Sequence, residues 1–173
     1  MPNGAMPKTG VIASEVTVSA CPVGMLAENG QKPGQIDPRG VPAMIEFLMI
    51  PGAPTPVAPT SHAVAADGWL FVTGQMPTDP ADDSAPLPEG IEAQTRRVIE
   101  NLKLVLAGAG CALGQVVFAR VYLTYFERDY APMNAVYQSY FAPDRLPART
   151  CVGVTGLARG ALVEIDLLAR RGD

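Results

Sequence analysis

The chain has 173 residues, of which 48% are hydrophobic, and this size and composition suit one domain with a single core. Its 13 basic and 17 acidic residues give a formal net charge of -4, and no run of like charge occurs. Nucleic acid is therefore not expected as a partner, because phosphate binding requires clustered lysine and arginine.

The cysteines and the apolar stretches bear on where the protein resides. Cys21, Cys111 and Cys151 are odd in number and widely spaced, which favours neither a disulfide framework nor a metal site. The longest apolar stretches fall far short of the ~20 residues that cross a bilayer, and no secretory signal pattern opens the chain. We therefore expect a cytoplasmic protein with no membrane partner.

Residues 1–44 differ in character from the rest of the chain. They are rich in proline, glycine and small polar residues, and they show no sustained helical or strand period. We interpret them as an extension outside the core, in which residues 14–20 alternate like a short edge strand. Residues 45–173 are expected to form the single domain.

A hairpin and a long loop are expected at the start of this domain. The apolar runs 63–66 and 69–73 are separated by Asp67 and Gly68, a dipeptide that suits a two-residue hairpin turn. Prolines within and next to residues 78–90 then mark a solvent-exposed loop.

An amphipathic helix and a strand follow. Apolar side chains recur at helical spacing over residues 91–109, with charged side chains on the other faces, and Gly108 and Gly110 lie where a helix would end. Residues 116–125 are β-branched and aromatic, which predicts a strand. Its alternation places one set of side chains on a single face: Val117, Ala119, Val121 and Leu123.

The remaining elements complete an α+β pattern. Pro132 stands where the first turn of a second helix would begin, and helical spacing continues to Pro143. Two further strands are expected over 149–154 and 162–169. This order predicts helices packed on one face of a mixed β-sheet. The other face would be uncovered in a monomer, so we expect an oligomer.

Several kinds of catalytic site are excluded. His62 is the only histidine, which rules out HExxH motifs and zinc sites with several histidine ligands. A catalytic triad would have to use His62, and no G-x-S-x-G elbow accompanies it. The chain also lacks a Walker loop and a dinucleotide-binding glycine motif.

Charged side chains in the C-terminal strands need an explanation. Strand alternation puts Arg149 and Cys151 on one face, and likewise Glu164 and Asp166 on one face of the last strand. A buried charge without a partner is unfavourable. One interpretation is an ion pair between Arg149 and Glu164 within the sheet, with Asp166 solvated. The other is a cationic anchor for a carboxylate ligand next to an acid/base.

Four short segments occur together in the region 51–170. They are Thr73-Gly-Gln-Met-Pro77, Asn134-Ala-Val-Tyr-Gln-Ser-Tyr-Phe141, Pro147-Ala-Arg-Thr-Cys-Val152 and Val163-Glu-Ile165. The first resembles a strand-end S/T-G-Q-x-P segment, and the second resembles a second-helix N-x-x-Y-x-x-[FY]-F motif. The last two resemble the C-terminal signature of the reactive intermediate deaminase (Rid) family, which includes RidA/YjgF-like enamine/imine deaminases.

The resemblance implies a fold, an assembly and an activity. The fold would be chorismate-mutase-like, assembled as a homotrimer with clefts at the subunit interfaces. Arg149 would bind the substrate carboxylate, and Glu164 would position or activate the water that attacks an imine carbon. Acids such as 2-iminobutanoate or 2-iminopropanoate would yield 2-oxo acids and ammonia, with no metal or organic cofactor. Further cleft positions would be Thr73, Gly74, Asn134 and Cys151.

Structural roles remain open for these further positions. Asn134 could cap or bridge at the start of its helix, and Cys151 could be a small core residue. Thr73 could serve only as a β-former at a strand end. Gly74 fits a close backbone approach or a positive φ.

One position departs from the family pattern. Thr60 stands where deaminase members usually have a tyrosine, just before the segment Ser61-His-Ala63. Loss of the ring would widen the pocket, which favours a larger imine such as an aminomuconate-like acid. Two alternatives are a member that only binds small carboxylates and a ribonuclease, although the acidic charge disfavours the latter.

Overall fold

The computed structural model describes residues 45–171, so the expectations for residues 1–44, an extension with a strand over 14–20, lie outside the described residues. The described chain is α+β, as predicted. Its strands and α-helices are β1 (Ile45–Leu48), β2 (Ala63–Ala66), β3 (Trp69–Gln75), α1 (Ile91–Gly108), β4 (Val116–Leu123), α2 (Phe126–Gln138), β5 (Ala148–Gly153) and β6 (Val163–Arg170). Neither described helix is long and apolar enough to cross a membrane.

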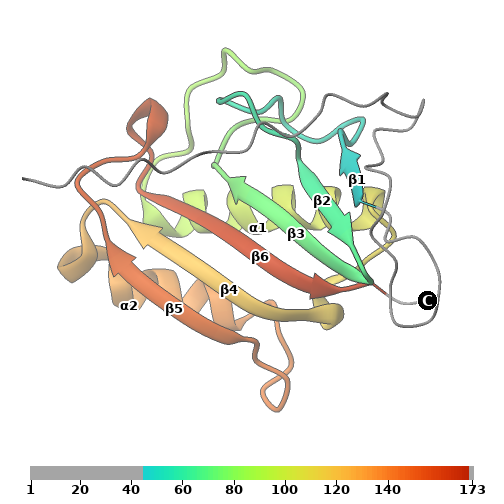
Figure 1. The fold of residues 1–173 in the computed structure, drawn as a ribbon. Coiled ribbons are helices and arrows are strands. Elements are labelled where there is room, and N and C mark those ends of the chain that lie inside the picture. Colours follow the sequence, from blue (N-terminus) through green and yellow to red (C-terminus); the bar gives the residue numbers. More distant parts are fainter. Residues whose placement is uncertain (1–44, 172–173) are drawn as a thin grey trace, which may run out of the picture. The chain divides into compact units, whose positions relative to one another are not determined.

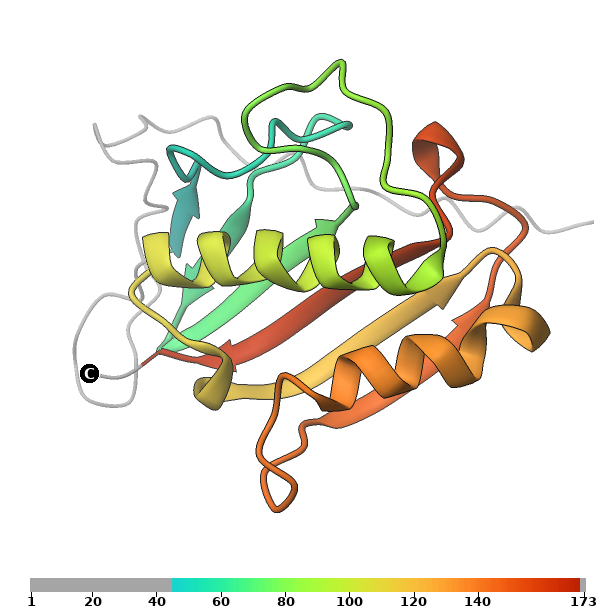
Figure 2. The same cartoon turned by 180° about the vertical axis from the view of Figure 1, so that it is seen from behind.

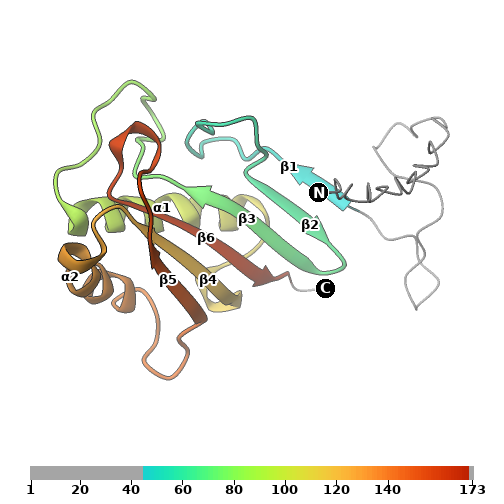
Figure 3. The same cartoon turned by 60° about the vertical axis from the view of Figure 1, so that its left-hand side comes forward.

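The strands form one mixed sheet in the order β1-β2-β3-β6-β4-β5 (Figure 1). Strands β4 and β5 run parallel and are connected through α2, while the other neighbouring pairs are antiparallel. Figure 2 shows α1 and α2 on the same face of the sheet. Figure 3 shows β1 and β5 at its two edges. The predicted arrangement, a mixed sheet with two helices on one face, is confirmed.

The hairpin turn forms where the sequence predicts it. Asp67 and Gly68 have positive φ angles of 49° and 76°, the backbone that a two-residue turn between twisted strands requires. Strand β1, by contrast, has no counterpart among the predicted elements. It pairs with β2 from Ile45 to Leu48, and four residues are too few for alternation to stand out.

The core lies between the sheet and the two helices. The apolar stripe of α1 is buried, as its spacing predicts, and so are the inward residues of β4 and β6. Burying one large aliphatic side chain contributes about 1.5–3 kcal/mol. Fully buried members include Val98, Leu102, Val105, Leu106, Val121, Leu123, Met133, Val163 and Ile165.

The second helix starts earlier than the prediction from Pro132 places it. The helix begins at Phe126, and Pro132 lies inside it. Proline lacks an N–H group, so it removes one helical hydrogen bond, but the chain on both sides remains helical. Glu127 and Asp129 lie in the first turn, where acidic side chains favour a helix N-terminus. These two acidic residues mark the true start of α2.

A bulge corrects the predicted face of Val117. The pairing of β4 with β6 shifts between Val116 and Phe118, so one extra residue enters β4. Val116 is buried, whereas Val117 is 40% exposed and does not share the buried face of Ala119. Strict alternation fails there because a one-residue shift moves a side chain to the other face.

The sheet face away from the helices carries a continuous apolar row. One residue from each of five neighbouring strands takes part through direct pairing: Phe47, Val64, Phe71, Leu168 and Phe118. Phe47 is 69% exposed and Phe71 is 51% exposed, and no described element covers them. Such a surface is typical of an interface, although the homotrimer itself stays a prediction.

Candidate active site

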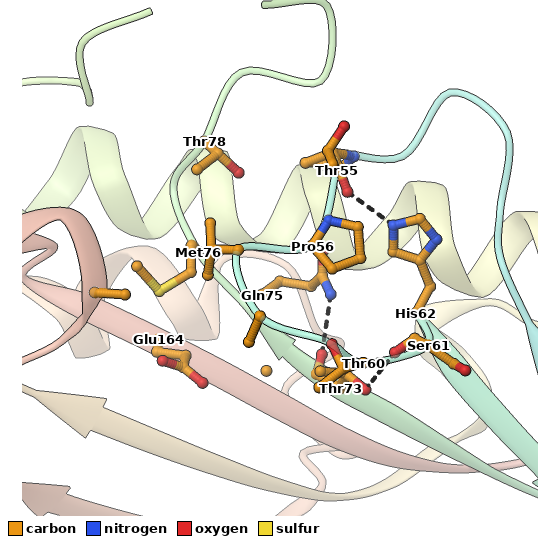
Figure 4. Close-up of a pocket in the computed structure, with 15 residues that line it drawn as sticks. Thr55, Pro56, Thr60, Ser61, His62, Thr73, Gln75, Met76, Thr78 and Glu164 are labelled. Carbon is orange, nitrogen blue, oxygen red and sulfur yellow. Dashed lines mark hydrogen bonds between the residues drawn. The ribbon is translucent and has the colours of Figure 1, made fainter. Parts of the chain in front are cut away.

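A pocket of about 240 Å³ opens beside the ends of β3 and β6. Its walls come from the segment between β1 and β2, from the end of β3 with the turn that follows it, and from β6. Glu164 lies on one side, and Thr60 and Pro56 lie across from it (Figure 4). The pocket unites four of the predicted site residues: Thr60, Thr73, Gly74 and Glu164.

A bulge in β3 brings Gly74 against Glu164. The pairing of β3 with β6 shifts between Val72 and Gln75, so one extra residue is accommodated there. A Cβ added at Gly74 would lie 2.9 Å from Cδ of Glu164 and nearer still to its Oε1. Gly74 does not have a positive φ. Of the two interpretations of this glycine, close approach is therefore the one that applies.

The environment of Glu164 suits acid/base chemistry. Its side chain is half-buried, and this burial raises the pKa of its carboxyl group, with a further upward contribution from the charge of Asp166. A carboxyl group whose pKa moves toward neutrality can both accept and return a proton. Glu164 can therefore act as a proton carrier within the pocket.

Two hydrogen bonds hold the pocket wall around Thr73. Its hydroxyl group donates to the carbonyl oxygen of Ser61 at 2.7 Å, and Nε2 of Gln75 donates to the carbonyl oxygen of Thr73 at 3.0 Å (Figure 4). Thr73 thus joins the end of β3 to the segment before β2. Its role is more than that of a β-former.

His62 is held as a structural residue. It is 4% exposed, and its Nδ1 accepts a hydrogen bond from the backbone N–H of Ile50 at 2.8 Å. Its Nε2 lies 2.8 Å from the carbonyl oxygen of Pro54, to which it donates. With both ring nitrogens occupied, His62 offers no free nitrogen to a nucleophile. This agrees with the exclusion of a catalytic triad.

Arg149 lies on the helix face of the sheet. It is paired with Ala119 of β4, whose side chain is fully buried beneath the helices. Its Cζ lies 4.7 Å from the ring centroid of Tyr137, and its Nη1 lies 4.0 Å from Sδ of Met133. Both neighbours belong to α2. The guanidinium group therefore packs against α2.

Glu164 lies on the opposite face from Arg149. It is paired with Tyr122, three residues along β4 from Ala119, and an odd separation within a strand means opposite faces. Arg149 on β5 and Glu164 on β6 are separated by two strand spacings across β4 and by three residues along it. This places their α-carbons roughly 14 Å apart. An ion pair between Arg149 and Glu164 within one chain is therefore ruled out.

Asp166 is not simply solvated either. Nε of Arg120 donates to its two carboxylate oxygens at 2.8 and 3.0 Å, and the hydroxyl group of Tyr122 donates to one of them at 3.2 Å. The ion pair within this part of the sheet is thus between Arg120 and Asp166, and the interpretation that assigned it to Arg149 and Glu164 is wrong. Asp166 remains a negative charge near Glu164.

Comparisons with known proteins place the chain in a family. Residues 51–171 match the family model described as Endoribonuclease L-PSP. A protein named 3-aminoacrylate deaminase RutC, from Acinetobacter baylyi, is 38% identical over 124 residues, which are 72% of this chain and 96% of the relative. The chain belongs to the Rid (RidA/YjgF) family. A RutC family protein from Pyrococcus horikoshii is 40% identical and covers 73% of this Rid chain and 98% of its own length.

Solved Rid structures agree with the fold. RidA from Psychrobacter sp. PAMC 21119 is 33% identical, with a TM-score of 0.67 over 72% of this chain and 98% of the other. TdcF from E. coli, solved with bound serine, is 28% identical, with a TM-score of 0.66 over 73% of this chain and 99% of the other.

On α2, whose Tyr137 ring packs against Arg149, the Rid chain has two buried polar atoms without a hydrogen-bond partner among the described residues. They are Oδ1 of Asn134 and the hydroxyl oxygen of Tyr137, which lie one helical turn apart on α2. A buried polar atom left unpaired costs about 1–3 kcal/mol. Because α2 begins at Phe126, Asn134 cannot cap it. That interpretation is wrong.

Cys151 is protonated at neutral pH. Burial raises the pKa of its thiol, while the nearby charge of Arg149 acts in the opposite direction to a smaller extent. The side chain packs against the core. A protonated, partly buried thiol is a poor nucleophile, so a packing role fits Cys151 better than a reactive one.

Tyr137 and Asp166 are residues near the candidate site whose roles sequence reasoning missed. Tyr137 lies in the second-helix motif, but helical spacing alone marks it only as a core residue. Its ring supports Arg149, and burial raises the pKa of its phenol to about 12, which keeps it protonated. The charge of Asp166 raises the pKa of Glu164, an effect that residue spacing in the sequence does not reveal.

Proposed function

We propose that this Rid chain is an enamine/imine deaminase that converts 2-imino acids into 2-oxo acids and ammonia. The observation that carries the proposal is the half-buried Glu164 carboxyl group, with its raised pKa, at the wall of a pocket. Arg149, which has no carboxylate partner among the described residues, would anchor the substrate carboxylate. The relative named 3-aminoacrylate deaminase supports the same reaction class.

The proposed reaction consumes one water and releases one ammonia. The water oxygen forms a bond to the imine carbon while Glu164 takes one proton from that water. Glu164 passes this proton to the substrate nitrogen, then takes the second water proton from the new hydroxyl group and delivers it to the same nitrogen. The carbon–nitrogen bond breaks, and ammonia leaves as the carbonyl forms. The protein has only to orient the carbon, the water and the proton carrier, so neither metal nor organic cofactor is part of the proposal.

We infer that each complete site uses two subunits. A small substrate cannot contact Arg149 and Glu164 of one chain, because they lie on opposite faces of the sheet roughly 14 Å apart. A homotrimer with clefts at its interfaces would bring Arg149 of one subunit to Glu164 of the next. The exposed row that includes Phe47 and Phe71 supports such an assembly.

Two variants test the proposal. Imines are generated in place from amino acids by an amino-acid oxidase, and ammonia release is followed with and without the protein. Arg149→Ala should mainly raise KM, because it removes the carboxylate anchor. Glu164→Gln should lower kcat by about 100-fold or more, the usual contribution of a proton carrier. Both should keep the oligomeric size of the wild type. Equal activity in both variants and the wild type would refute the assignment.

The family description raises ribonuclease activity as a second function. Among the residues that line the pocket, none is lysine or arginine, and His62 has no free ring nitrogen. RNA cleavage would need cations along the phosphate backbone. We therefore propose a cytoplasmic enzyme that acts on a small carboxylate and not on nucleic acid.

A further inference from the structure

We propose that the pocket beside Glu164 selects 2-imino monocarboxylates with bulky apolar side chains and excludes dicarboxylates. This inference rests on the proposed function, in which Arg149 of a neighbouring subunit holds the single carboxylate. The substrate side chain then occupies the pocket. What lines the pocket decides which side chains are accepted.

Most of the accessible surface of the pocket wall is apolar. The apolar lining residues come from the segment before β2, from the turn after β3 and from the loop before β6: Pro54, Pro56, Val57, Ala58, Met76 and Ala158. Met76 is itself 5% exposed, and the thioether adapts to side chains of different shape. These residues would replace water around an aliphatic or thioether group.

Two polar side chains of the wall are turned toward backbone groups. The Thr73 hydroxyl donates to Ser61, and the Gln75 amide donates to Thr73. The hydroxyl proton of Thr73 and one of the two amide N–H groups of Gln75 are therefore already used, so these side chains offer little to a polar side chain of the substrate. The remaining side-chain hydroxyl groups on the wall belong to Thr55, Thr60, Ser61 and Thr78, which are uncharged.

The charges in the pocket exclude a second carboxylate. Glu164 is the one acidic lining residue among those described, and its pKa is already raised by burial and by Asp166. Within residues 45–171, no lysine or arginine lines the pocket: Arg159, next to Ala158, donates instead to the carbonyl oxygen of Ala85 at 3.0 Å. A second substrate carboxylate would lie beside Glu164 with no partner, which disfavours binding. Among the larger imines that Thr60 suggests, the aminomuconate-like dicarboxylate is therefore not favoured.

The volume of the pocket exceeds the need of a small side chain. A water-sized group takes about 30 Å³, so a methyl or ethyl side chain would leave most of the 240 Å³ unfilled. Thr60 is small and exposed at the wall opposite Glu164 (Figure 4). A branched four-carbon or thioether side chain fills more of this space.

The first test compares imines from four amino acids. An amino-acid oxidase generates them from alanine, leucine, methionine and glutamate, and the imine that escapes hydrolysis is trapped with semicarbazide. We expect kcat/KM for the leucine and methionine imines to exceed that for the alanine imine by about tenfold or more, since each methylene in an apolar pocket discriminates strongly. The glutamate imine should be the poorest substrate.

The second test fills the pocket. Thr60→Tyr should lower kcat/KM for the leucine imine by at least about tenfold more than kcat/KM for the alanine imine, because the ring occupies the space of a large side chain. Ala107→Tyr adds the same ring at an exposed position of α1 outside the pocket, and it serves as the matched control. An equal loss on both imines in Thr60→Tyr would contradict the pocket assignment.

Titration of the protein with the stable 2-oxo acid products tests the side-chain selectivity of the pocket separately from the deaminase activity. The products keep the carboxylate and the side chain, so 4-methyl-2-oxopentanoate should bind more tightly than pyruvate, and 2-oxoglutarate most weakly. Turnover of the alanine or glutamate imine in preference to the leucine imine would overturn the selectivity and leave the deaminase function intact. Selective product binding without turnover of any imine would support the pocket and overturn the deaminase function.

Discussion

At the scale of single residues, the environment of Glu164 matters most. Burial, with a smaller effect from Asp166, raises the pKa of its carboxyl group above the ordinary value of 4.5. The folded chain therefore binds this proton more tightly than the unfolded chain does. Stability that comes from this group is present at low pH and is lost as the pH rises from 4.5 through the raised pKa. An ionised Glu164 thus lowers stability at neutral pH.

Glu164→Gln should accordingly stabilise the protein at neutral pH. The amide stays uncharged, so the loss of stability between pH 4.5 and neutrality that stems from this residue should disappear. Thermal unfolding of the wild type and the variant at a series of pH values measures the effect. A gap in Tm that narrows as the pH rises would contradict the assigned direction of the shift.

Tyr137 should position Arg149 through its ring. The guanidinium carbon lies 4.7 Å from the ring centroid, and a cation over an aromatic ring is stabilised by about 0.5–2 kcal/mol. Tyr137→Leu should therefore raise KM by about 2- to 30-fold with little change in kcat. Tyr137→Phe keeps the ring and should keep KM near the wild-type value. A similar KM in the Leu and Phe variants would show that the ring does not orient Arg149.

At the scale of the elements, periodicity predicts what is long and regular. The hairpin at Asp67 and Gly68 and the apolar stripe of α1 follow from turn chemistry and helical spacing. The start of α2 does not, because Pro132 suggests a first turn more strongly than Glu127 and Asp129 do. β-Bulges are equally hidden, since alternation assumes that no residue is added to a strand.

The bulge in β3 gives a prediction at this scale. Gly74→Ala would place a methyl group against the Glu164 carboxyl group, so the side chain must move away from its place in the pocket. We expect kcat to fall about tenfold or more, while the oligomer stays assembled. Gly114→Ala is the matched control, because a Cβ there would meet no atom within 4 Å. Equal kcat in the two variants would mean that the contact does not position Glu164.

At the scale of the whole molecule, the sequence predicts the site residues but not which of them meet. Alternation assigns faces within a strand, and it places Arg149 with Cys151 and Glu164 with Asp166. It says nothing of register between strands, and the pairing through β4 puts the two pairs on opposite faces. The ion pair that seemed natural from residue types therefore does not form.

The same geometry divides the proposed site into two halves within one chain. One half is the pocket with Glu164 and Gly74, and the other is Arg149 with the unpaired polar atoms of Asn134 and Tyr137. The open sheet face, with its apolar row, offers the surface through which subunits could join them.

Mixed oligomers of Arg149→Ala and Glu164→Gln subunits, made by co-expression with two tags, test this account most directly. At substrate concentrations below the wild-type KM, each variant alone should be nearly inactive, Arg149→Ala through weak binding and Glu164→Gln through slow turnover. In a trimer that carries both tags, and hence both variants, one of the three interfaces joins an intact Arg149 to an intact Glu164, so about a third of the sites should recover activity. Recovery to about that level is the predicted result. Mixed oligomers as inactive as their parents would contradict a site shared between subunits.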